Sequence, residues 1–454
     1  MTDQALSITP DDYGLLTDLY QLTMAACYVG EGISDRWASF ELFTRRLPDD
    51  YGYGVAMGLA QAIDYLTHWR FSEAQLTTLR QTGLFDQAPE AFWQTLAGGR
   101  FTGNLWAVPE GTVIFPNQPL LRVEAPLWQA QLAETYLLNT LNYQTLIATR
   151  AARLRQVAGP DTRLLEFGTR RAFSPQGSLW AARAALAGGL DATSNVLAAL
   201  RLDRKPAGTM AHALVMAFTA IEGHEDDAFT AFHRYFPGAA LLIDTYDTVA
   251  AAARLAQQVQ QGQATVAAVR LDSGDLAALS QAVRSQLPNA IIFASGDLDE
   301  YEIARLQQAG APIDGYGLGT KLVTGEPVNG VYKLVEIDGI PVMKESDSKT
   351  TFPGRKQVFR RFEHGQALGD RLGLMDEPAA ADEQPLLQLV IHQGQAVQGY
   401  DSLETIAQRT TTSVAHLPAS VRRINQPESY PVTISQALHD LTDRTRQSVP
   451  QPLS

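Results

Sequence analysis

The sequence predicts an α/β protein whose central part is a parallel sheet covered by helices. After Pro160, apolar strand-like runs alternate with amphipathic helical runs at spacings suited to βα units. The strand-like runs are apolar throughout, which is typical of parallel strands buried on both faces. Each run ends in polar side chains, as expected where a site is built at one edge of such a sheet. An α/β barrel and a doubly wound sheet both satisfy this pattern.

Residues 1–159 are expected to form a helical domain with a small, sandwich-like β module. The run Leu15–Val29 has apolar residues at three- and four-residue spacing, which predicts a helix. The alternating run "SFELFTRRLP" predicts a strand. Leu105–Pro126 combines short β-rich runs with Pro-containing turns, and Leu127–Gly159 predicts one long helix that ends at Gly159-Pro160.

Residues 160–335 are expected to form the catalytic α/β domain. Its six strand-like runs are "RLLEFG" ending at Gly168, "PAGTMA" ending at Ala211, "AALLID" ending at Asp244, "TVAAVRLDSG" ending at Gly274, "AIIFASGD" ending at Asp297 and "IDGYGLGT" ending at Thr320. Helical runs such as "TVAAAARLAQQVQQG" lie between them. Residues 336–454 begin β-rich and then lose pattern, so this C-terminal segment is expected to pack back on the N-terminal domain.

Composition excludes several classes of protein. With 36 Lys and Arg against 49 Asp and Glu, the formal net charge is −13, which argues against a nucleic-acid or anionic-membrane partner and requires any cationic site to be local. The one cysteine, Cys27, rules out an intrachain disulfide and a cysteine metal cluster, and it fits a reducing cytoplasm. No run reaches transmembrane length and the N-terminus lacks a signal-peptide pattern, so we expect a cytoplasmic protein.

The strand ends carry groups that can bind phosphates, sugars and metal ions. Glycine-rich backbone in "GYGLGT" (Gly317, Gly319) and "SGDLDE" (Ser295, Gly296) can point N–H donors at a phosphate, although glycine also simply forms turns. "RLDSGDL" places Asp272, Ser273 and Asp275 where they could hold ribose hydroxyls or a magnesium-bound pyrophosphate. The alternative for these residues is an Asx turn and a helix N-cap.

Four further residues have both a functional and a structural interpretation. Arg170 and Arg171 suit a carboxylate or a phosphate because guanidinium groups bind two oxygens at once, but the pair could also be a solvated turn. His212 lies between a small-residue turn and an apolar helical run, where a packed core histidine is the alternative. Tyr20 could offer a ring face to a flat ligand or belong to the core.

Seven motifs in order resemble the nicotinate phosphoribosyltransferase family, over about Leu15 to Arg361. They are "LLTDLYQLTM", "LLEFGTRRA", "SNVLAAL", "AGTMAH", "VRLDSGDL", "GYGLGT" and "GVYKLVE". The resemblance implies a type II phosphoribosyltransferase, with an irregular α/β barrel attached to a helical and β-rich domain made from both chain ends, working as a homodimer. It implies an enzyme of NAD biosynthesis that joins nicotinate to phosphoribosyl pyrophosphate, with Mg²⁺, giving nicotinate mononucleotide and pyrophosphate with coupled ATP hydrolysis.

The resemblance also implies roles for individual residues. His212 matches the histidine that becomes phosphorylated, and Tyr20, Thr209 and Arg270 match nicotinate contacts, with Arg171 placed for the nicotinate carboxylate. Thr320 matches a contact to phosphoribosyl pyrophosphate. The remaining residues assigned to this sugar phosphate are Asp272, Ser273, Asp275, Ser295, Gly296, Gly317 and Gly319, with Asp272 and Asp275 also near magnesium. Lys333 and Lys344 are further cationic candidates, each with a surface lysine as the alternative.

Three other functions compete with this one. Nicotinamide phosphoribosyltransferases have an acidic residue where this chain places Ser194, and a carboxamide substrate would not require Arg171. Quinolinate phosphoribosyltransferases share the barrel in a shorter chain without "GTMAH". A phosphate-binding barrel without catalysis is the third, and the presence of Arg171, His212, Asp272 and Asp275 together argues against it.

Overall fold

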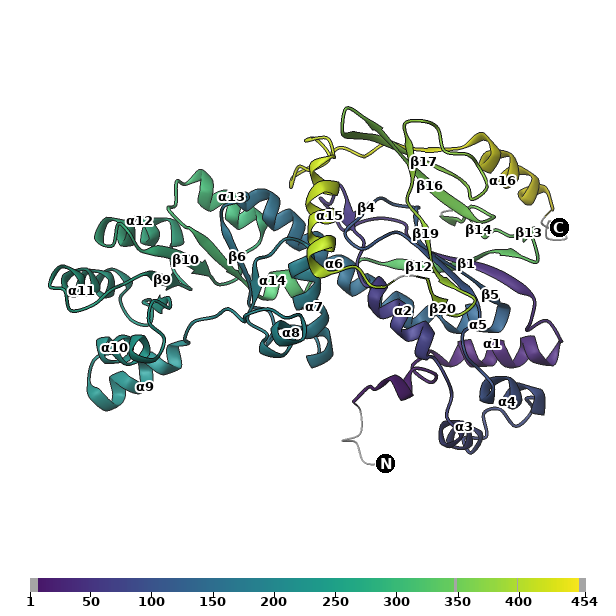
Figure 1. Ribbon diagram of the computed structural model, residues 1–454, viewed down its shortest axis with the longest axis horizontal. Helices are drawn as coiled ribbons and strands as arrows, with labels where there is room; N and C mark the ends of the chain where they lie inside the picture. The colour runs from purple at the N-terminus through teal and green to yellow at the C-terminus, as the bar shows by residue number, and fades with distance from the viewer. Residues whose placement is uncertain (1–6, 347–348, 398, 449–454) are drawn as a thin grey trace. The chain divides into compact units, whose positions relative to one another are not determined.

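The computed structural model describes residues 7–346, 349–397 and 399–448, and the chain forms two compact units (Figure 1). The first unit consists of Met1–Leu146 and Pro327–Ser454, and the second of Ile147–Glu326. The long helix α6 (Glu134–Ala158) contributes residues to both. The domain boundaries after residues 159 and 335 stay predictions.

A seven-stranded antiparallel sheet joins the two chain segments of the first unit. Its strands, in spatial order, are β13 (Ile340–Pro341), β12 (Gly330–Ile337), β1 (Trp37–Thr44), β5 (Pro119–Pro126), β3 (Asn104–Ala107), β19 (Gln388–His392) and β20 (Gln395–Ala396). Phe40 of β1 lies opposite Leu334 on one side and Val123 on the other. The predicted helical and β-rich domain made from both chain ends is therefore confirmed.

Smaller sheets and eight helices complete the described part of the first unit. A four-stranded sheet has the order β18 (Glu383–Pro385), β16 (Lys356–Glu363), β17 (Gln366–Leu374), β21 (Val432–Ile434), and two-stranded pairs join β2 (Gly54–Val55) to β4 (Val113–Ile114) and β14 (Glu345–Ser346) to β15 (Lys349–Thr350). The helices besides α6 are the 3₁₀ turn Pro10–Asp12, α1 (Leu19–Gly30), α2 (Leu59–His68), α3 (Glu73–Arg80), α4 (Glu90–Ala97), α5 (Leu127–Leu132), α15 (Leu403–Ala415) and α16 (Gln436–Ser448). The predicted helix over Leu127–Gly159 is thus two helices, which meet at Ala133.

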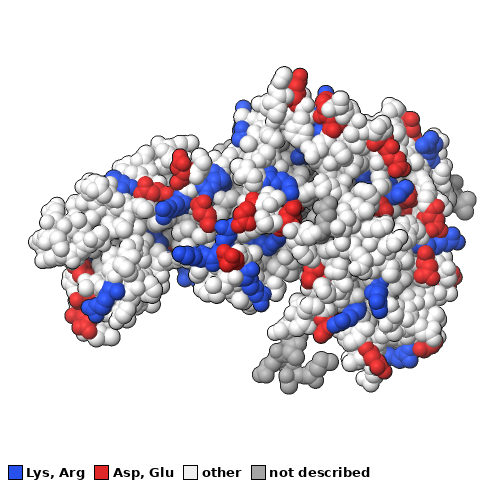
Figure 2. Space-filling view, viewed as in Figure 1, with Lys and Arg blue, Asp and Glu red and all other residues white. Residues whose placement is uncertain are grey.

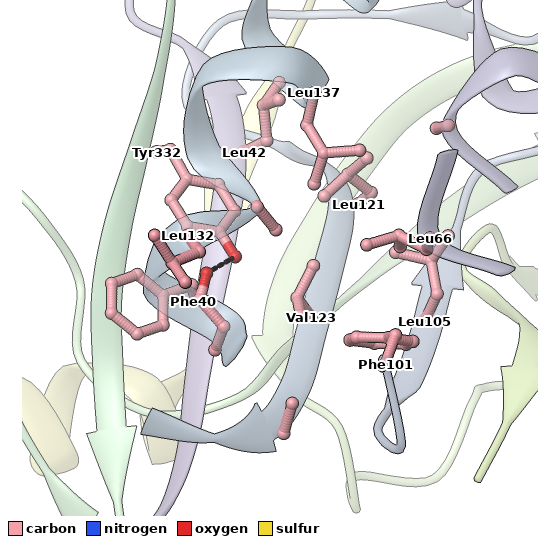
Figure 3. Close-up of a cluster of buried hydrophobic side chains, with 14 of the residues drawn as sticks. Phe40, Leu42, Leu66, Phe101, Leu105, Leu121, Val123, Leu132, Leu137 and Tyr332 are labelled. Atoms are coloured by element: carbon pink, nitrogen blue, oxygen red, sulfur yellow. Dashed lines mark hydrogen bonds between the residues drawn. The ribbon is translucent and has the colours of Figure 1, made fainter. Parts of the chain in front are cut away.

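The core of the first unit is aliphatic and aromatic (Figure 3). Phe40 stacks on Tyr332 with ring centroids 5.0 Å apart, and the Tyr332 hydroxyl donates a hydrogen bond to the carbonyl oxygen of Ala130 at 2.7 Å. The bond satisfies a hydroxyl that would otherwise be buried without a partner. Each fully buried side chain of this kind contributes about 1.5–3 kcal/mol of transfer free energy. The cluster ties β12, after the second unit, to β1 near the start of the chain.

The second unit contains a six-stranded sheet whose pairs are all parallel, which confirms the predicted α/β class. The order is β7 (Ala192–Thr193), β6 (Arg163–Glu166), β11 (Gly315–Leu318), β10 (Ile291–Ser295), β9 (Ala268–Leu271), β8 (Leu241–Leu242). Its helices are α7 (Pro175–Ala187), α8 (Val196–Arg201), α9 (His212–Glu222), α10 (Glu225–Tyr235), α11 (Thr248–Gln260), α12 (Leu276–Gln286), α13 (Glu300–Gln308) and α14 (Thr320–Val323). The barrel is irregular, because no ladder joins β7 to β8 among the described residues.

One predicted strand is wrong, and one strand was not predicted. The run "PAGTMA" is extended but belongs to no sheet, whereas Ala192–Thr193 forms the edge strand β7. Pro206 has no backbone N–H to donate to a ladder, and among the described residues the run makes one backbone hydrogen bond to the sheet, from the Ala207 amide to the carbonyl oxygen of Thr193 at 2.9 Å. Across the described ranges, none of the helices is both long and apolar enough to cross a membrane.

Candidate functional site

The carboxyl ends of β8, β9 and β10 bring three polar segments of the second unit together. The buried carboxylate of Asp244, 2% exposed, accepts hydrogen bonds through Oδ2 from the Asp272 amide and from Ser273 Oγ, both at 2.8 Å. Asp272 Oδ1 in turn accepts from Ser295 Oγ at 2.5 Å. Parallel strands end at the same sheet edge, which is why residues far apart in sequence meet here. The structure thus brings together Asp272, Ser273 and Ser295, as the sequence predicts.

His212 is the first residue of α9 and lies beside this carboxylate cluster. Its Nδ1 is 3.0 Å from Thr245 Oγ1, and its Nε2 is 3.9 Å from Asp244 Oδ1 and 4.0 Å from Asp272 Oδ2. The imidazole is 38% exposed. His212 is therefore not a packed core histidine: it is held on one ring nitrogen and faces carboxylates on the other.

Arg270 and Thr209 form the second pair of predicted residues that contact each other. Arg270 Nη1 donates to Thr209 Oγ1 at 2.7 Å. Burial lowers the pKa of the Arg270 guanidinium, against the opposing effect of Asp272 and Asp244, and nearby Arg170 lowers it further. Two buried polar atoms here, Arg270 Nε and Asp244 Oδ1, have no hydrogen-bond partner among the residues that the structure describes. Buried polar atoms without a partner are uncommon in folded proteins, so these two are candidates for a ligand contact.

A polar cleft of about 520 Å³ opens at the ends of β9 and β10. Its lining residues are Asp272, Ser273, Gly274, Leu276, Gly296, Asp297, Leu298, Asp299, Tyr301, Glu302, Arg305 and Lys321. Gly296 has φ +98°, and a Cβ there would lie 2.2 Å from the carbonyl oxygen of Asp272. The position therefore requires glycine on two grounds, and it lets backbone line the cleft without a side chain.

Local charge at the cleft is mixed. Lys321 Nζ lies 2.7 Å from Asp299 Oδ2, and this contact raises the pKa of the lysine. Arg305 pairs with Glu302, three residues away on α13. On the visible face in Figure 2, Lys and Arg are interspersed with Asp and Glu. The cleft lining carries four carboxylates against two cations, both of them paired, so an anionic ligand would need an accompanying metal cation here.

Other predicted residues have structural roles in this region. Asp275 caps α12, with Oδ1 accepting from the amides of Ala277 and Ala278. Gly317 is buried in β11, where a Cβ would lie 2.5 Å from the Phe167 ring. Gly319 precedes the four-residue helix α14, whose first residue is Thr320. The N-cap alternative thus holds for Asp275, and close packing explains Gly317.

The paired arginines lie on an exposed turn after β6. The carbonyl oxygen of Gly168 accepts from the amides of Arg171 and Ala172, at 2.8 and 3.0 Å, and so closes the turn. Neither guanidinium makes a side-chain hydrogen bond or ion pair with the described residues. The positive charge of Arg170 lowers the pKa of Arg270. The two cations are therefore presented to solvent from a fixed backbone.

Three candidates lie in the first unit. Tyr20, on α1, is 48% exposed, and burial raises the pKa of its hydroxyl with help from Glu134 and Asp18. Lys333, on β12, is half-buried: burial lowers its pKa, and Nζ donates to the carbonyl oxygen of Tyr332 at 2.7 Å. Lys344 is exposed. Lys344 is near enough to Lys333 to lower the pKa of its ammonium group further, as Arg45 also does.

The donor set fits a magnesium ion that also binds substrate phosphates. No cluster of three or more His, Cys, Asp or Glu side chains suited to a metal occurs among the described residues. Asp272 Oδ2 and Asp244 Oδ1 are carboxylate oxygens without hydrogen bonds in that same part of the chain. Magnesium is usually bound by one or two carboxylates together with substrate phosphates, so two oxygens suffice.

Two functional candidates received no role from the sequence. Thr245, which bonds to His212, directly follows Asp244, but a threonine at a strand end gives no distinct signal. Glu166 is buried at the end of β6 and bonds to Gly168 and Thr193. The signal for it was a glutamate inside the apolar run "RLLEF", since carboxylates are rarely buried without a specific partner.

Comparison with known proteins covers nearly the whole chain. Residues 15–142 match the nicotinate phosphoribosyltransferase N-terminal domain, 162–292 the nicotinate phosphoribosyltransferase family and 379–442 the corresponding C-terminal domain. The chain is 41% identical to nicotinate phosphoribosyltransferase pncB2 of Mycobacterium tuberculosis, covering 93% of this chain and 92% of that one. It is 39% identical to nicotinate phosphoribosyltransferase of Bacillus subtilis, covering 97% and 98%. The crystal structure of human nicotinic acid phosphoribosyltransferase superposes with a TM-score of 0.82 at 32% identity, covering 94% and 99%.

Proposed function

The chain belongs to the nicotinate phosphoribosyltransferase family and is an enzyme of pyridine nucleotide biosynthesis, and we propose that it joins nicotinate to phosphoribosyl pyrophosphate at the carboxyl-end edge of its parallel sheet. The supporting observation is the cluster of Asp244, Asp272 and His212 beside the Arg270–Thr209 pair. Acidic residues for a metal-bound sugar phosphate and a cation for a carboxylate thus lie at one sheet edge.

The residues divide between the two substrates. We assign the pyrophosphate and ribose to the cleft beside Asp272, Ser273, Ser295 and Gly296, with Gly317, Gly319 and Thr320 near the next strand end. We assign nicotinate to Thr209, Arg270 and Arg171. Mg²⁺ held by Asp272 and Asp244 would neutralise charge on the leaving pyrophosphate. Because Asp275 Oδ1 caps a helix, Asp244 is the better second ligand.

Transfer of the phosphoribosyl group to nicotinate depends mainly on how the two substrates are positioned. As pyrophosphate leaves the anomeric carbon, the ribose develops oxocarbenium character and the pyridine nitrogen forms the new bond. Neither event needs a strong acid or base, so fixed hydrogen bonds and placed charges contribute most of the acceleration. Asp272 is suited to this role because two hydrogen bonds fix it. Ser295 Oγ donates to its side chain, and its own backbone amide donates to Asp244.

His212 is the proposed phosphorylation site. The γ-phosphoryl group of ATP would pass to a ring nitrogen with release of ADP, and water would later cleave the phosphoramidate. A phosphorylated imidazole would place new negative charge next to Asp244 and Asp272, which lie within 4.0 Å. Like-charge repulsion would then rearrange this edge and change substrate affinity during the cycle. A homodimer in the cytoplasm completes the proposal.

Labelling with γ-³²P ATP tests the assignment. We expect acid-labile, alkali-stable label on wild-type enzyme, assigned to His212 by mass spectrometry, and formation of nicotinate mononucleotide but not of the nicotinamide product. His212→Asn should lose both label and ATP hydrolysis while it keeps slow synthesis at high phosphoribosyl pyrophosphate, because transfer depends on positioning. The control is His233→Asn, a histidine of the same unit bonded to the carbonyl oxygen of Ala239, which should label normally. Label on another residue, or normal ATP coupling in folded His212→Asn, would contradict the proposal.

A further inference from the structure

A buried carboxylate joins two turns at the predicted nicotinate site. Glu166, the last residue of β6, is 1% exposed. Its Oε1 accepts a hydrogen bond from the Gly168 amide, and its Oε2 accepts one from Thr193 Oγ1. It makes no ion pair with a described Lys, Arg or His, so its side-chain contacts with the described residues are these two hydrogen bonds.

The Gly168 bond controls the turn that carries the arginines. The peptide groups of Gly168 donate to Glu166 on one side and accept from the Arg171 and Ala172 amides on the other. A Cβ at Gly168 would lie 2.4 Å from Val323 Cγ1, so the backbone there is also confined by packing. Fixing this peptide therefore fixes the direction in which Arg170 and Arg171 leave the sheet.

The Thr193 bond controls the next edge of the site. Thr193 Oγ1 also accepts from the Asn195 amide at 2.9 Å, and the Thr193 carbonyl oxygen accepts from the Ala207 amide at 2.9 Å. Ala207 is two residues before Thr209, the partner of Arg270. A short series of hydrogen bonds thus leads from Glu166 through Thr193 to Ala207, two residues before Thr209 in the predicted nicotinate site.

We propose that Glu166 is a positioning residue for nicotinate: its carboxylate holds the Arg170–Arg171 turn and the Thr193–Thr209 segment in mutual register without touching substrate. This inference rests on the proposed function. A carboxylate accepts from both donors as they stand, whereas a glutamine amide offers one acceptor and one donor, so the Thr193 hydroxyl would have to turn its proton away from residue 166. Keeping an unpaired carboxylate buried costs free energy, and burial accordingly raises its pKa in spite of both hydrogen bonds.

Steady-state kinetics of Glu166→Gln test the proposal. Losing one of two hydrogen bonds to a charged group should raise KM for nicotinate about tenfold. We expect kcat and KM for phosphoribosyl pyrophosphate to stay within about twofold, because the cleft residues hydrogen-bond to one another and not to Glu166. A general loss of structure would lower kcat and change both KM values together.

Thr193 supplies an independent pair of variants. Thr193→Val removes the hydroxyl donor and should raise KM for nicotinate in the same way, while Thr193→Ser retains the hydroxyl and should restore the wild-type value. The control is Glu225→Gln, which alters another buried glutamate of the second unit, paired with Arg254, and should lower stability without changing KM for nicotinate.

The outcomes separate the inference from the proposed function. Wild-type enzyme that makes no nicotinate mononucleotide overturns the proposed function, and this inference with it. Active wild-type enzyme with unchanged KM for nicotinate in folded Glu166→Gln overturns the inference alone. If Glu166→Gln does not fold, the Thr193 pair decides: equal nicotinate KM in Thr193→Val and Thr193→Ser is the negative result.

Discussion

At the scale of single residues, two of the buried polar atoms that lack a hydrogen bond among the described residues lie at the proposed site. Within the described part of the chain, Asp244 Oδ1 and Arg270 Nε are buried and have no hydrogen-bond partner. A buried donor or acceptor without a partner costs about 1–3 kcal/mol, so folding alone does not favour these arrangements. Asp244 Oδ1 is a carboxylate oxygen, which favours a cation or a hydrogen-bond donor. Arg270 Nε carries a hydrogen, which favours an anionic acceptor. A metal-bound sugar phosphate and a pyridine carboxylate would satisfy one each.

Gly296 allows a single-residue test of the cleft. Gly296→Ala places a Cβ 2.2 Å from the carbonyl oxygen of Asp272 and forces an L-residue to φ +98°, so the turn must move. We expect KM for phosphoribosyl pyrophosphate to rise at least about tenfold, since displacing a positioning segment by an ångström is that costly. Nicotinate affinity, measured by calorimetry, should change little.

The matched control is Gly310→Ala. Gly310 also has a positive φ, +65°, but nothing lies within 4 Å of a Cβ built there. It should lose only about 1 kcal/mol of stability from backbone strain, with unchanged kinetics. Equal kinetic effects in the two variants would show that backbone strain, and not the cleft, is responsible.

At the scale of elements, continuous apolar runs predicted the central strands well. β6, β9, β10 and β11 all fall within runs identified from the sequence. The edge strand β7 was not predicted because two residues give no periodicity, and "PAGTMA" was wrongly predicted because composition does not show which backbone donors find a ladder. Short edge elements depend on tertiary contacts that a local pattern does not contain.

The four-stranded sheet provides a prediction about pH. Arg371 on β17 donates from Nε and Nη2 to both oxygens of Glu383 on β18, at 2.9 and 2.6 Å, and these bonds lower the pKa of that carboxyl. A depressed folded-state pKa stabilises the fold above the ordinary value of 4.5 and loses that effect as pH falls through the depressed value. We therefore expect Glu383→Gln to lower the free energy of unfolding by about 2 kcal/mol at pH 7.

Urea denaturation at several pH values measures this effect. The difference between wild type and Glu383→Gln should shrink as pH falls below 4.5 and disappear at the acid end. Glu363→Gln is the control, because Glu363 is an exposed glutamate at the end of β16. A stability difference that does not depend on pH would assign the role of Glu383 to shape and not to charge.

For the whole molecule, the sequence predicted which polar residues lie at the strand ends, but not the network of hydrogen bonds among them. Asp272, Ser295 and Asp244 were each expected at a sheet edge. The hydrogen bond by which the Asp244 carboxylate fixes the Asp272 backbone amide was not predicted. Sequence order could not give this, because the bond joins segments 28 residues apart. The pairing of β1 with β12 is likewise a long-range event, for which two compatible apolar strands are necessary but not sufficient.

The division into two units predicts where the sugar phosphate changes local stability. All lining residues of the cleft belong to Ile147–Glu326. A ligand that binds only the closed native state at ten times its Kd suppresses local opening about tenfold. Hydrogen exchange with Mg²⁺ and phosphoribosyl pyrophosphate should therefore slow by about that factor in peptides covering residues 272–275 and 295–299, and hardly change in the β16–β17 hairpin of the first unit. Gly296→Ala at the same ligand concentration should lose the protection. Protection confined to the first unit, or equal in both units, would place the sugar-phosphate site elsewhere.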